Sequence, residues 1–484
     1  MKKKSLGINA VLNGMRNILN IIFPIITFPY VSRVLRVGEI GKYNFSSSFV
    51  SYFLLIAALG ISTYAVREGS KIRDDYKKLS NFASQIFSIN IVSTIISYIL
   101  LFLSLLIFKK LHPYTSCIII FSIQIIFTTI GTEWIYTIFE DFTYITARSI
   151  LFKIISVILL FLLVRKPGDY LNYAMITVFS AVGSNVLNYI HAKKFCDIKL
   201  TMKIEWKKHI KPILVIFASS VAITIYLSLD TTLLGIMKND YAVGIYAVST
   251  KIYNIIKQLM SAILTVTIPR FAYLWGEKRI REFKDLLCEI SDVLALIAIP
   301  ASVGVFMLAP QIILILSSSK YIQAVTSLRL LCPALIFSIF SWIFTSCVLI
   351  PIKRENKVLV TTIIAAVFNL VFNILFIPVF SENAAAFLTS LSEFISMVMG
   401  IYFCNDILSG VYTKSFWKNI FVYLIGSLSI IVVCIVFKRE FTSYLVSGLF
   451  SIVFSMISYT LVLIVGKNEY AFQIIKVMKA KFFK

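Results

Sequence analysis

The sequence is poor in charged residues: Asp, Glu, Lys and Arg make up 14% of its 484 residues, against about 25% in an average soluble domain. Hydrophobic residues reach 59% instead. No Gly-x-x-x-x-Gly-Lys-Ser/Thr motif occurs, so direct hydrolysis of ATP is excluded. The seven cysteines contain no Cys-x-x-Cys pair and the three histidines are scattered. We therefore expect no disulfide framework, no metal site and no other cofactor.

The apolar residues occur in stretches long enough to cross a bilayer, which takes about 20 residues. They predict an all-α integral membrane protein with fourteen spans. The predicted spans are approximately Leu6–Leu35, Ile40–Val66, Phe82–Phe108, Tyr114–Phe139, Phe142–Val164, Tyr170–Ile190, Pro212–Met237, Tyr241–Pro269, Leu286–Ala309, Ala324–Ile350, Val358–Phe380, Ala384–Cys404, Asn419–Phe437 and Ser443–Val465.

The basic residues indicate a topology, because Lys and Arg favour cytoplasmic loops. With the N-terminus in the cytoplasm, 30 of them fall in inner segments, 9 in outer segments and 8 in the spans. This ratio predicts that both termini are cytoplasmic. It also explains most of the net charge of +24, so no nucleic-acid partner is needed, and contact with membrane lipids is expected.

Two short motifs each occur twice, and the two copies are separated by nearly the same number of residues in both cases. The run GKYNFS at Gly41 matches GIYAVS at Gly244, 203 residues later, and Trp134 matches Trp342, 208 residues later. Six predicted spans separate each pair, so we interpret spans one to six and seven to twelve as repeats with a pseudo-twofold axis along the membrane normal. The predicted domains are two six-helix lobes, 1–205 and 206–405, followed by an additional helix pair, 406–484. The Lys-rich connection from His191 to Lys211 is expected to link the lobes.

Charges within the predicted spans are mostly basic. We identify three acids in the spans, Glu133, Asp230 and Glu393, and eight bases. A charge in the hydrocarbon region costs at least about 2.5–3.5 kcal/mol and faces a partner or a cavity. The excess of bases predicts an anionic ligand. The eight bases are Arg16, Arg33, Lys42, Arg148, Lys153, Lys251, Lys257 and Arg329.

Polar residues of the first and eighth predicted spans share one face of each helix, within about 100° of its circumference. Lipid cannot solvate such a face. We interpret the two faces as cavity walls; hydrogen bonding between helices is the alternative. The residues are Asn9, Asn13, Arg16, Asn17, Asn20 and Thr27 in the first span, and Tyr246, Thr250, Tyr253, Asn254, Lys257 and Ser261 in the eighth.

Depth divides the bases further. Arg33, Lys42 and Arg329 lie near an outer boundary, where a long side chain can reach the headgroups, whereas the other five lie deeper. The predicted substrate-binding residues are Asn13, Arg16, Asn17, Asn20, Lys42, Arg148, Lys153, Lys251, Asn254 and Lys257.

The three acids are candidates for ion coupling. Asp230 is placed to pair with Lys251 across the turn around Asn239. Glu133 and Glu393 have no obvious partner nearby in sequence, and burial of an isolated carboxylate favours binding of a proton or a cation. Structural ion pairing is the alternative role.

Several motifs match one known family. They are the Pro-x-x-x-Arg run from Pro29 to Arg33, then Gly38 and Gly41-x-Tyr43, the run Tyr64–Glu68, and Asp230 before Gly244-x-Tyr246. These motifs resemble those of the Wzx-type polysaccharide flippases, which belong to the multidrug, oligosaccharidyl-lipid and polysaccharide exporter superfamily.

The resemblance implies a V-shaped pair of six-helix lobes with two extra helices in a bacterial cytoplasmic membrane. It implies movement of undecaprenyl-pyrophosphate-linked oligosaccharide from the inner to the outer leaflet, beside a polysaccharide polymerase and chain-length machinery. The pyrophosphate would supply the anion. Basic residues that line the cavity in such flippases correspond here to Arg16, Lys42, Lys251 and Lys257, although span seven lacks such a residue before Lys238.

Three other functions remain as alternatives. A flippase for the peptidoglycan precursor would also bind a pyrophosphate. A multidrug cation antiporter should have a cavity with more acid than base. A polymerase would need a larger extramembrane loop than Pro310–Gln323, the longest outer one, so we do not expect an enzyme.

Overall fold

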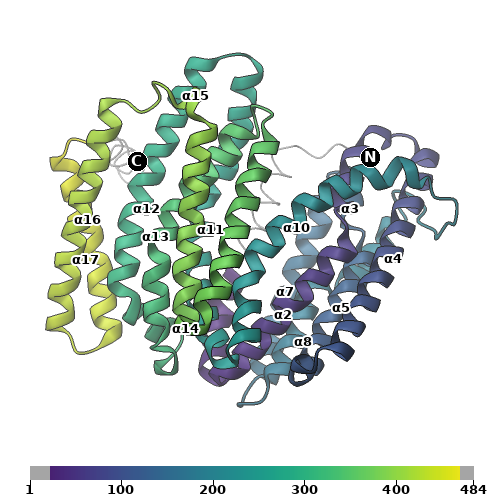
Figure 1. Cartoon of the computed structure of the whole chain (residues 1–484), viewed down its shortest axis with the longest axis horizontal. Helices are drawn as coiled ribbons and strands as arrows, with labels where there is room; N and C mark the ends of the chain where they lie inside the picture. The colour runs from purple at the N-terminus through teal and green to yellow at the C-terminus, as the bar shows by residue number, and fades with distance from the viewer. Residues whose placement is uncertain (1–21, 469–484) are drawn as a thin grey trace. The chain divides into compact units, whose positions relative to one another are not determined.

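The computed structural model describes residues 22–468. The chain divides into two compact units, Met1–Gly244 (unit 1) and Ile245–Lys484 (unit 2). All regular elements in the described part are helices, and no strand occurs there (Figure 1). Apolar helices dominate because only helices or closed barrels can satisfy every backbone polar group within a bilayer.

Unit 1 is built from long apolar helices interrupted by short breaks. Its elements are the helix Ile22–Val34 and then α2 (Val37–Ala58), α3 (Ile61–Gly69), η1 (Ser70–Ile72), α4 (Tyr76–Ile107), η2 (Lys109–Tyr114), α5 (Thr115–Gly131), α6 (Glu133–Ile138), α7 (Phe142–Leu163), α8 (Tyr170–Val182), α9 (Asn185–Ala192), α10 (Trp206–Met237) and the first residues of α11 (Asp240–Gly276).

Unit 2 contains the rest of α11 and ends with a helix pair. Its further elements are α12 (Ile280–Leu316), η3 (Ser319–Tyr321), α13 (Ala324–Trp342), the π-helix η4 (Ile343–Leu349), α14 (Glu355–Phe403), α15 (Asn405–Leu408), α16 (Lys414–Glu440) and α17 (Tyr444–Val465).

Eleven helices in the described part are long and apolar enough to cross a membrane. Predicted spans one, six, eleven and twelve account for the difference from fourteen. The first lies partly outside the described residues, and the sixth is divided at Gly183 between α8 and α9. The eleventh and twelfth both fall within α14, which kinks at Ser381 (φ 53°). The multi-pass membrane fold is thus confirmed, while the count of fourteen stays a prediction.

The broken helices expose backbone groups that neighbouring side chains satisfy. At the end of α2, Leu59 and Gly60 adopt positive φ angles of 46° and 72°. The freed carbonyl of Ala57 accepts bonds from Asn90 Nδ2 at 2.8 Å and Ser93 Oγ at 2.6 Å, both on α4. The last carbonyls of a helix have no partner within it, so these polar residues are needed where α2 ends inside the apolar region.

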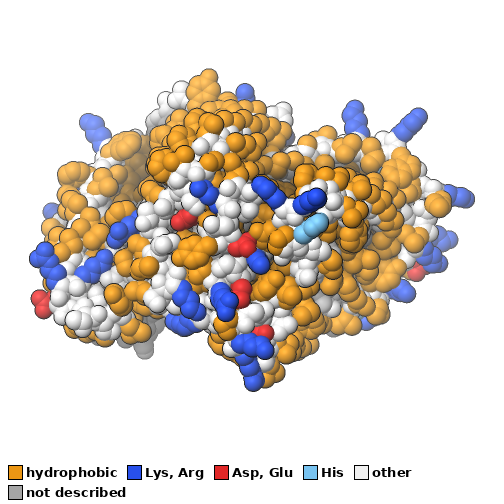
Figure 2. Space-filling model, turned by 60° about the horizontal axis from the view of Figure 1, so that its bottom comes forward, with side chains coloured by type: hydrophobic (Ala, Val, Ile, Leu, Met, Phe, Trp, Pro, Cys, Tyr) orange, Lys and Arg blue, Asp and Glu red, His pale blue; other side chains and the backbone are white. Residues whose placement is uncertain are grey.

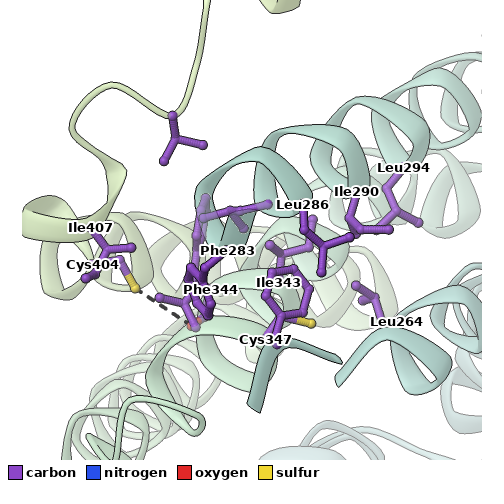
Figure 3. Close-up of a cluster of buried hydrophobic side chains, with 14 of the residues drawn as sticks. Leu264, Phe283, Leu286, Ile290, Leu294, Ile343, Phe344, Cys347, Cys404 and Ile407 are labelled. Atoms are coloured by element: carbon purple, nitrogen blue, oxygen red, sulfur yellow. Dashed lines mark hydrogen bonds between the residues drawn. The ribbon is translucent and has the colours of Figure 1, made fainter. Parts of the chain in front are cut away.

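An apolar cluster joins α11, α12, η4 and α15 in unit 2. Figure 3 shows Phe283 and Leu286 of α12 beside Ile343 and Phe344 of η4. All four are at most 6% exposed. The π-helix η4 can approach α14 closely because Gly400 of α14 has no side chain. A Cβ at Gly400 would lie 2.8 Å from the Cβ of Phe344 in η4. Small residues at such contacts are typical of membrane helices.

Large parts of the surface are apolar. Figure 2 shows hydrophobic side chains over much of the face drawn, interrupted by Lys and Arg. Such helices suit a lipid environment, where exposed apolar side chains carry no cost.

The start of α11 crosses α2 at a very close backbone contact. A Cβ at Gly41 would lie 1.7 Å from the carbonyl oxygen of Asp240, and one at Gly244 would lie 2.2 Å from that of Val37. The two glycines are the first residues of the two recurring motifs. Their occurrence in both motifs is therefore explained by a packing requirement at this crossing.

We predict that Gly41→Ala destabilises the protein by about 3 kcal/mol or more, because the new methyl group overlaps backbone atoms that cannot move independently. The matched control is Gly38→Ala, one turn earlier on α2, whose Cβ would meet Asp240 Cβ at an ordinary 3.7 Å. Thermal unfolding in detergent should show a large loss for the first variant and none for the second. Equal melting temperatures would contradict the close crossing.

Candidate functional site

A buried ion pair connects two helices of unit 2. Lys257 Nζ on α11 lies 2.7 Å from Glu393 Oε1 on α14, and the two side chains are 23% and 8% exposed. Tyr253 supports the pair: its hydroxyl donates to Glu393 Oε1 at 3.5 Å, and its ring lies 5.5 Å from the ammonium. Each charge thus has an opposite charge in a region of low dielectric constant.

Unit 1 contains a second pair, between Arg148 on α7 and Glu133 at the start of α6. Arg148 Nη2 lies 3.4 Å from Glu133 Oε1, and the arginine side chain is 6% exposed while that of the glutamate is 41% exposed. Arg148 Nη1 also donates to the carbonyl of Ser184 at 3.1 Å, which lies at the break between α8 and α9 and also accepts the N–H of Asn188. The guanidinium therefore holds a carboxylate and a broken helix together.

A polar cavity of 190 Å³ lies inside unit 1, and Glu133 contributes to its wall. The cavity is large enough for several water molecules, since one occupies about 30 Å³ of liquid. Its lining combines apolar residues with hydroxyls, amides and one carboxylate. The lining residues are Leu54, Ala57, Ala58, Ser62, Asn90, Ile125, Thr128, Thr129, Glu133, Trp134, Ala181, Val182 and Asn185.

One hydrogen bond occurs in the same form in both units. Tyr43 OH bonds Thr177 Oγ1 at 3.1 Å in unit 1, and Tyr246 OH bonds Thr389 Oγ1 at 3.1 Å in unit 2. The tyrosines are 203 residues apart and the threonines 212. The tyrosines belong to the two recurring motifs, and the threonines lie in predicted spans six and twelve.

These offsets also relate the cavity to the unit 2 ion pair. Lys257 follows Leu54 by 203 residues, and Glu393 follows Ala181 by 212. Leu54 and Ala181 both line the cavity of unit 1. If the units are repeats, unit 2 has a paired ammonium and carboxylate where unit 1 has two apolar residues, Leu54 and Ala181, at the wall of the cavity.

The predicted substrate-binding residues are only partly brought together. Arg148 is paired with Glu133, and Lys257 with Glu393. Lys42 on α2, Lys153 on α7 and Lys251 on α11 are half-buried, whereas Asn254 is exposed. Four further residues lie outside the described part of the chain: Asn13, Arg16, Asn17 and Asn20.

The partners of the candidate coupling acids differ from those expected from the sequence. Glu133 and Glu393 lack a partner nearby in sequence, but each has one on another helix, because helix packing joins residues 15 and 136 positions apart. Asp230 is 7% exposed within α10, and its proposed pairing with Lys251 stays a prediction.

Asp292 is a buried acid that the sequence-based prediction did not include. Beyond the three acids identified in the spans, the ninth predicted span contains Glu289 and Asp292. Asp292 is 4% exposed and accepts bonds of 2.6 Å from Asn419 Nδ2 and Tyr423 OH on α16. It attaches the final helix pair to α12. Its position in a mostly apolar predicted span was the available signal.

The apolar helices define a class, the multi-pass helical membrane protein. The lipid II flippase MurJ in an inward closed conformation is similar over 94% of this chain and 98% of its own, with a TM-score of 0.73 at 15% identity. A multidrug resistance MATE family transporter of the MOP superfamily, inward-facing, is similar over 81% and 95%, with a TM-score of 0.61 at 14% identity. At these identities the likeness concerns the fold.

The chain belongs to the polysaccharide biosynthesis protein family, whose model matches residues 6–275; the MatE model matches residues 216–375. A putative O-antigen transporter of Escherichia coli (strain K12) is 22% identical over 56% of this chain and 66% of its own length. The capsular polysaccharide biosynthesis protein CapF of Staphylococcus aureus is 22% identical over 81% and 98%. These matches confirm the family resemblance, and the families and neighbours found are transporters, not enzymes.

We predict that Glu393→Ala destabilises the protein by about 3–5 kcal/mol, because it leaves the ammonium of Lys257 buried without its counter-charge. The double variant Lys257→Met/Glu393→Leu should cost far less, since it removes both charges and keeps the volume. Thermal unfolding of the purified variants measures both effects. The control is Asn254→Ala, an exposed position on the same helix. Strictly additive losses in the double variant would contradict a stabilising pair.

Proposed function

We propose that the protein is a flippase for undecaprenyl-pyrophosphate-linked oligosaccharide, which it moves from the inner to the outer leaflet for assembly of a surface polysaccharide. Membership of the polysaccharide biosynthesis family supports this proposal. So do the names of two relatives, an O-antigen transporter and a capsular polysaccharide biosynthesis protein.

One observation carries the assignment of an anionic headgroup. Lys251 is half-buried in α11, 11 residues and so about 16 Å from the start of that helix. Among the described residues of unit 2 it forms no ion pair. An ammonium at such depth is costly without a counter-charge, and the phosphates of the lipid carrier would supply one.

Lys257 would act as a second contact that is exchanged. Before substrate binds, Glu393 neutralises its ammonium at 2.7 Å. A pyrophosphate carries more charge than a carboxylate and presents more acceptor oxygens, so it can compete for the lysine. Release of Glu393 would then transmit headgroup binding to α14, the helix on which this residue lies. Lys42, Lys153 and the Arg16 face of the first span are proposed to complete the basic surface.

Coupling to an ion gradient is proposed for the cavity of unit 1. Glu133 lines it together with Asn90, Thr129 and Asn185, and oxygen donors of this kind suit a proton, a hydronium ion or Na⁺. In unit 2 the corresponding place is occupied by the ammonium of Lys257 and the carboxylate of Glu393. Asp230 and Glu393 are the further coupling candidates.

The transport cycle is proposed to be alternating access between two repeats of six helices, with fourteen membrane helices in total. The recurring motifs, the shared Tyr–Thr bonds at 3.1 Å and the glycine pair at the α2–α11 crossing support the repeat. Both termini are proposed to be cytoplasmic, because basic residues are concentrated in the segments on that side.

The peptidoglycan precursor is the second candidate substrate. The specific observation in its favour is the structural similarity to the lipid II flippase over 94% of this chain. Both substrates share the pyrophosphate and differ in the sugars. A deletion strain distinguishes them, because the intermediate that accumulates is an oligosaccharide lipid in one case and a peptide-bearing sugar lipid in the other.

We predict that Lys251→Gln reduces export of lipid-linked oligosaccharide about tenfold or more, since it removes a charge-assisted contact to phosphate. Lys251→Arg keeps the charge and should retain part of the export. Arg16→Ala and the double variant Lys257→Met/Glu393→Leu should be impaired as well. Surface polysaccharide and the accumulated intermediate are measured at equal membrane levels of each variant. Wild-type export by these variants would refute the anionic site.

We predict that Glu133→Gln abolishes the response of transport to an imposed proton or sodium gradient. The neutral amide keeps the shape of the side chain but cannot bind the ion as a carboxylate does. The matched control is Glu140→Gln, which also faces an arginine, Arg73, at 3.3 Å but does not line the cavity. Headgroup translocation in proteoliposomes provides the measurement. A gradient response that survives in Glu133→Gln would exclude this cavity as the coupling site.

A further inference from the structure

The connection between α9 and α10 is docked along α4 rather than free. In Figure 1 the chain leading into α10 runs beside α4. Three serines spaced one turn apart on α4 accept backbone N–H groups from every second residue of this connection. Ser80 Oγ accepts from Asp197 at 3.0 Å, Ser84 from Lys199 at 3.1 Å and Ser88 from Thr201 at 2.9 Å.

The spacing of the serines fits the spacing of the backbone N–H groups for a geometric reason. Four residues of an α-helix rise about 6.0 Å, and two residues of an extended chain advance about 6.6 Å. Serines at i, i+4 and i+8 can therefore meet N–H groups at j, j+2 and j+4. Each bond also satisfies a backbone donor that an extended chain outside a sheet leaves without a backbone partner.

The docked chain runs toward the middle of α4 and then returns. From Ser80 to Ser88 it advances about 12 Å along the helix axis. Thr201 Oγ1 then accepts from the N–H of Lys203 at 3.1 Å, and the N–H of Ile204 bonds the Met202 carbonyl at 3.1 Å. These bonds define a tight turn centred on Met202.

The returning chain is fixed by buried polar contacts. The N–H of Glu205 donates to Gln85 Oε1 at 2.9 Å. His209, which is 1% exposed, bonds Tyr64 OH through Nδ1 at 2.8 Å and Gln85 Oε1 through Nε2 at 3.2 Å. The turn at Met202 is therefore held from both ends.

The tip of this turn has the chemistry of a membrane surface anchor. Met202 is 99% exposed and Leu200 is 69% exposed, whereas Lys199 and Lys203 are exposed on either side. The tip reaches the level of Ser88, six residues inside the predicted span that begins at Phe82. That depth is about 9 Å at the helical rise, and amphipathic anchors bury their apolar face about 5–10 Å into the headgroup boundary.

We propose that this turn, residues 199–203, is an interfacial anchor that inserts Leu200 and Met202 into the boundary of an anionic bilayer while Lys199 and Lys203 contact lipid phosphates. The connection contains seven lysines between residues 193 and 211, and charge complementarity selects anionic over zwitterionic lipid. The anchor does not depend on which molecule the protein transports.

The test uses the full-length protein in nanodiscs that contain phosphatidylglycerol, with an environment-sensitive dye on Met202→Cys. Background labelling is low because burial raises the pKa of the nearby Cys196 thiol to about 12, which keeps it protonated and unreactive. The half-buried Cys288 is replaced by serine. The control dye is placed at Glu277→Cys, an exposed position in the connection between α11 and α12.

Quenching by aqueous iodide should be at least about threefold weaker at position 202 than at 277, as expected for a side chain in the headgroup boundary. Equal quenching at both positions would overturn the proposal. Only protein and lipid are present, so a cytoplasmic partner cannot cause the shielding.

The charge contribution is tested with Lys199→Gln/Lys203→Gln in the same labelled background. Its quenching in phosphatidylglycerol should rise to the level that the unsubstituted labelled protein shows in phosphatidylcholine nanodiscs. Unchanged shielding in this variant, or equal shielding of the unsubstituted protein in the two lipids, would refute selection of anionic lipid.

Discussion

The structure depends on one constraint: within the apolar layer, each polar group needs a partner supplied by the protein. Long helices satisfy most backbone groups by themselves, but the breaks after α2, α5 and α8 free several of them. The carbonyl of Ala57 bonds Asn90 and Ser93. At the break after α8 the carbonyl of Ser184 accepts both the N–H of Asn188 and the guanidinium of Arg148. Many buried polar residues are therefore structural components of a broken helix, and a role in binding has to be argued separately for each.

The same constraint explains where the buried charged residues lie. Lys257 and Arg148 are both placed opposite a carboxylate from a different helix, which reduces the cost of burying either ion alone. In unit 2 the pair fills its site, whereas in unit 1 the corresponding positions border a cavity. If the units are repeats, this difference breaks their symmetry at the place where a transporter needs two distinct functions. Under the proposed function, one place would release a lysine to an anion while the other would accept a cation.

Close packing explains residues that look functional in a motif. Gly41 and Gly244 begin the two matching motifs because backbone atoms of α2 and α11 leave no room for a side chain. The tyrosines two positions later make the same hydrogen bond in both units. These motif residues are thus explained by packing, whereas Lys251 and Glu133, which lie outside the motifs, are not.

The sequence by itself determined the all-helical membrane class, the family resemblance and the relation between the two motif pairs, because hydropathy, charge bias and short motifs are local along the chain. Only the tertiary structure decided that Glu393 meets Lys257, that Asp292 attaches the final helix pair to α12, and that the Lys-rich connection is docked on the serines of α4. These contacts join residues more than a hundred positions apart. Their formation depends on how helices pack and where they break, which periodicity along a single span does not encode.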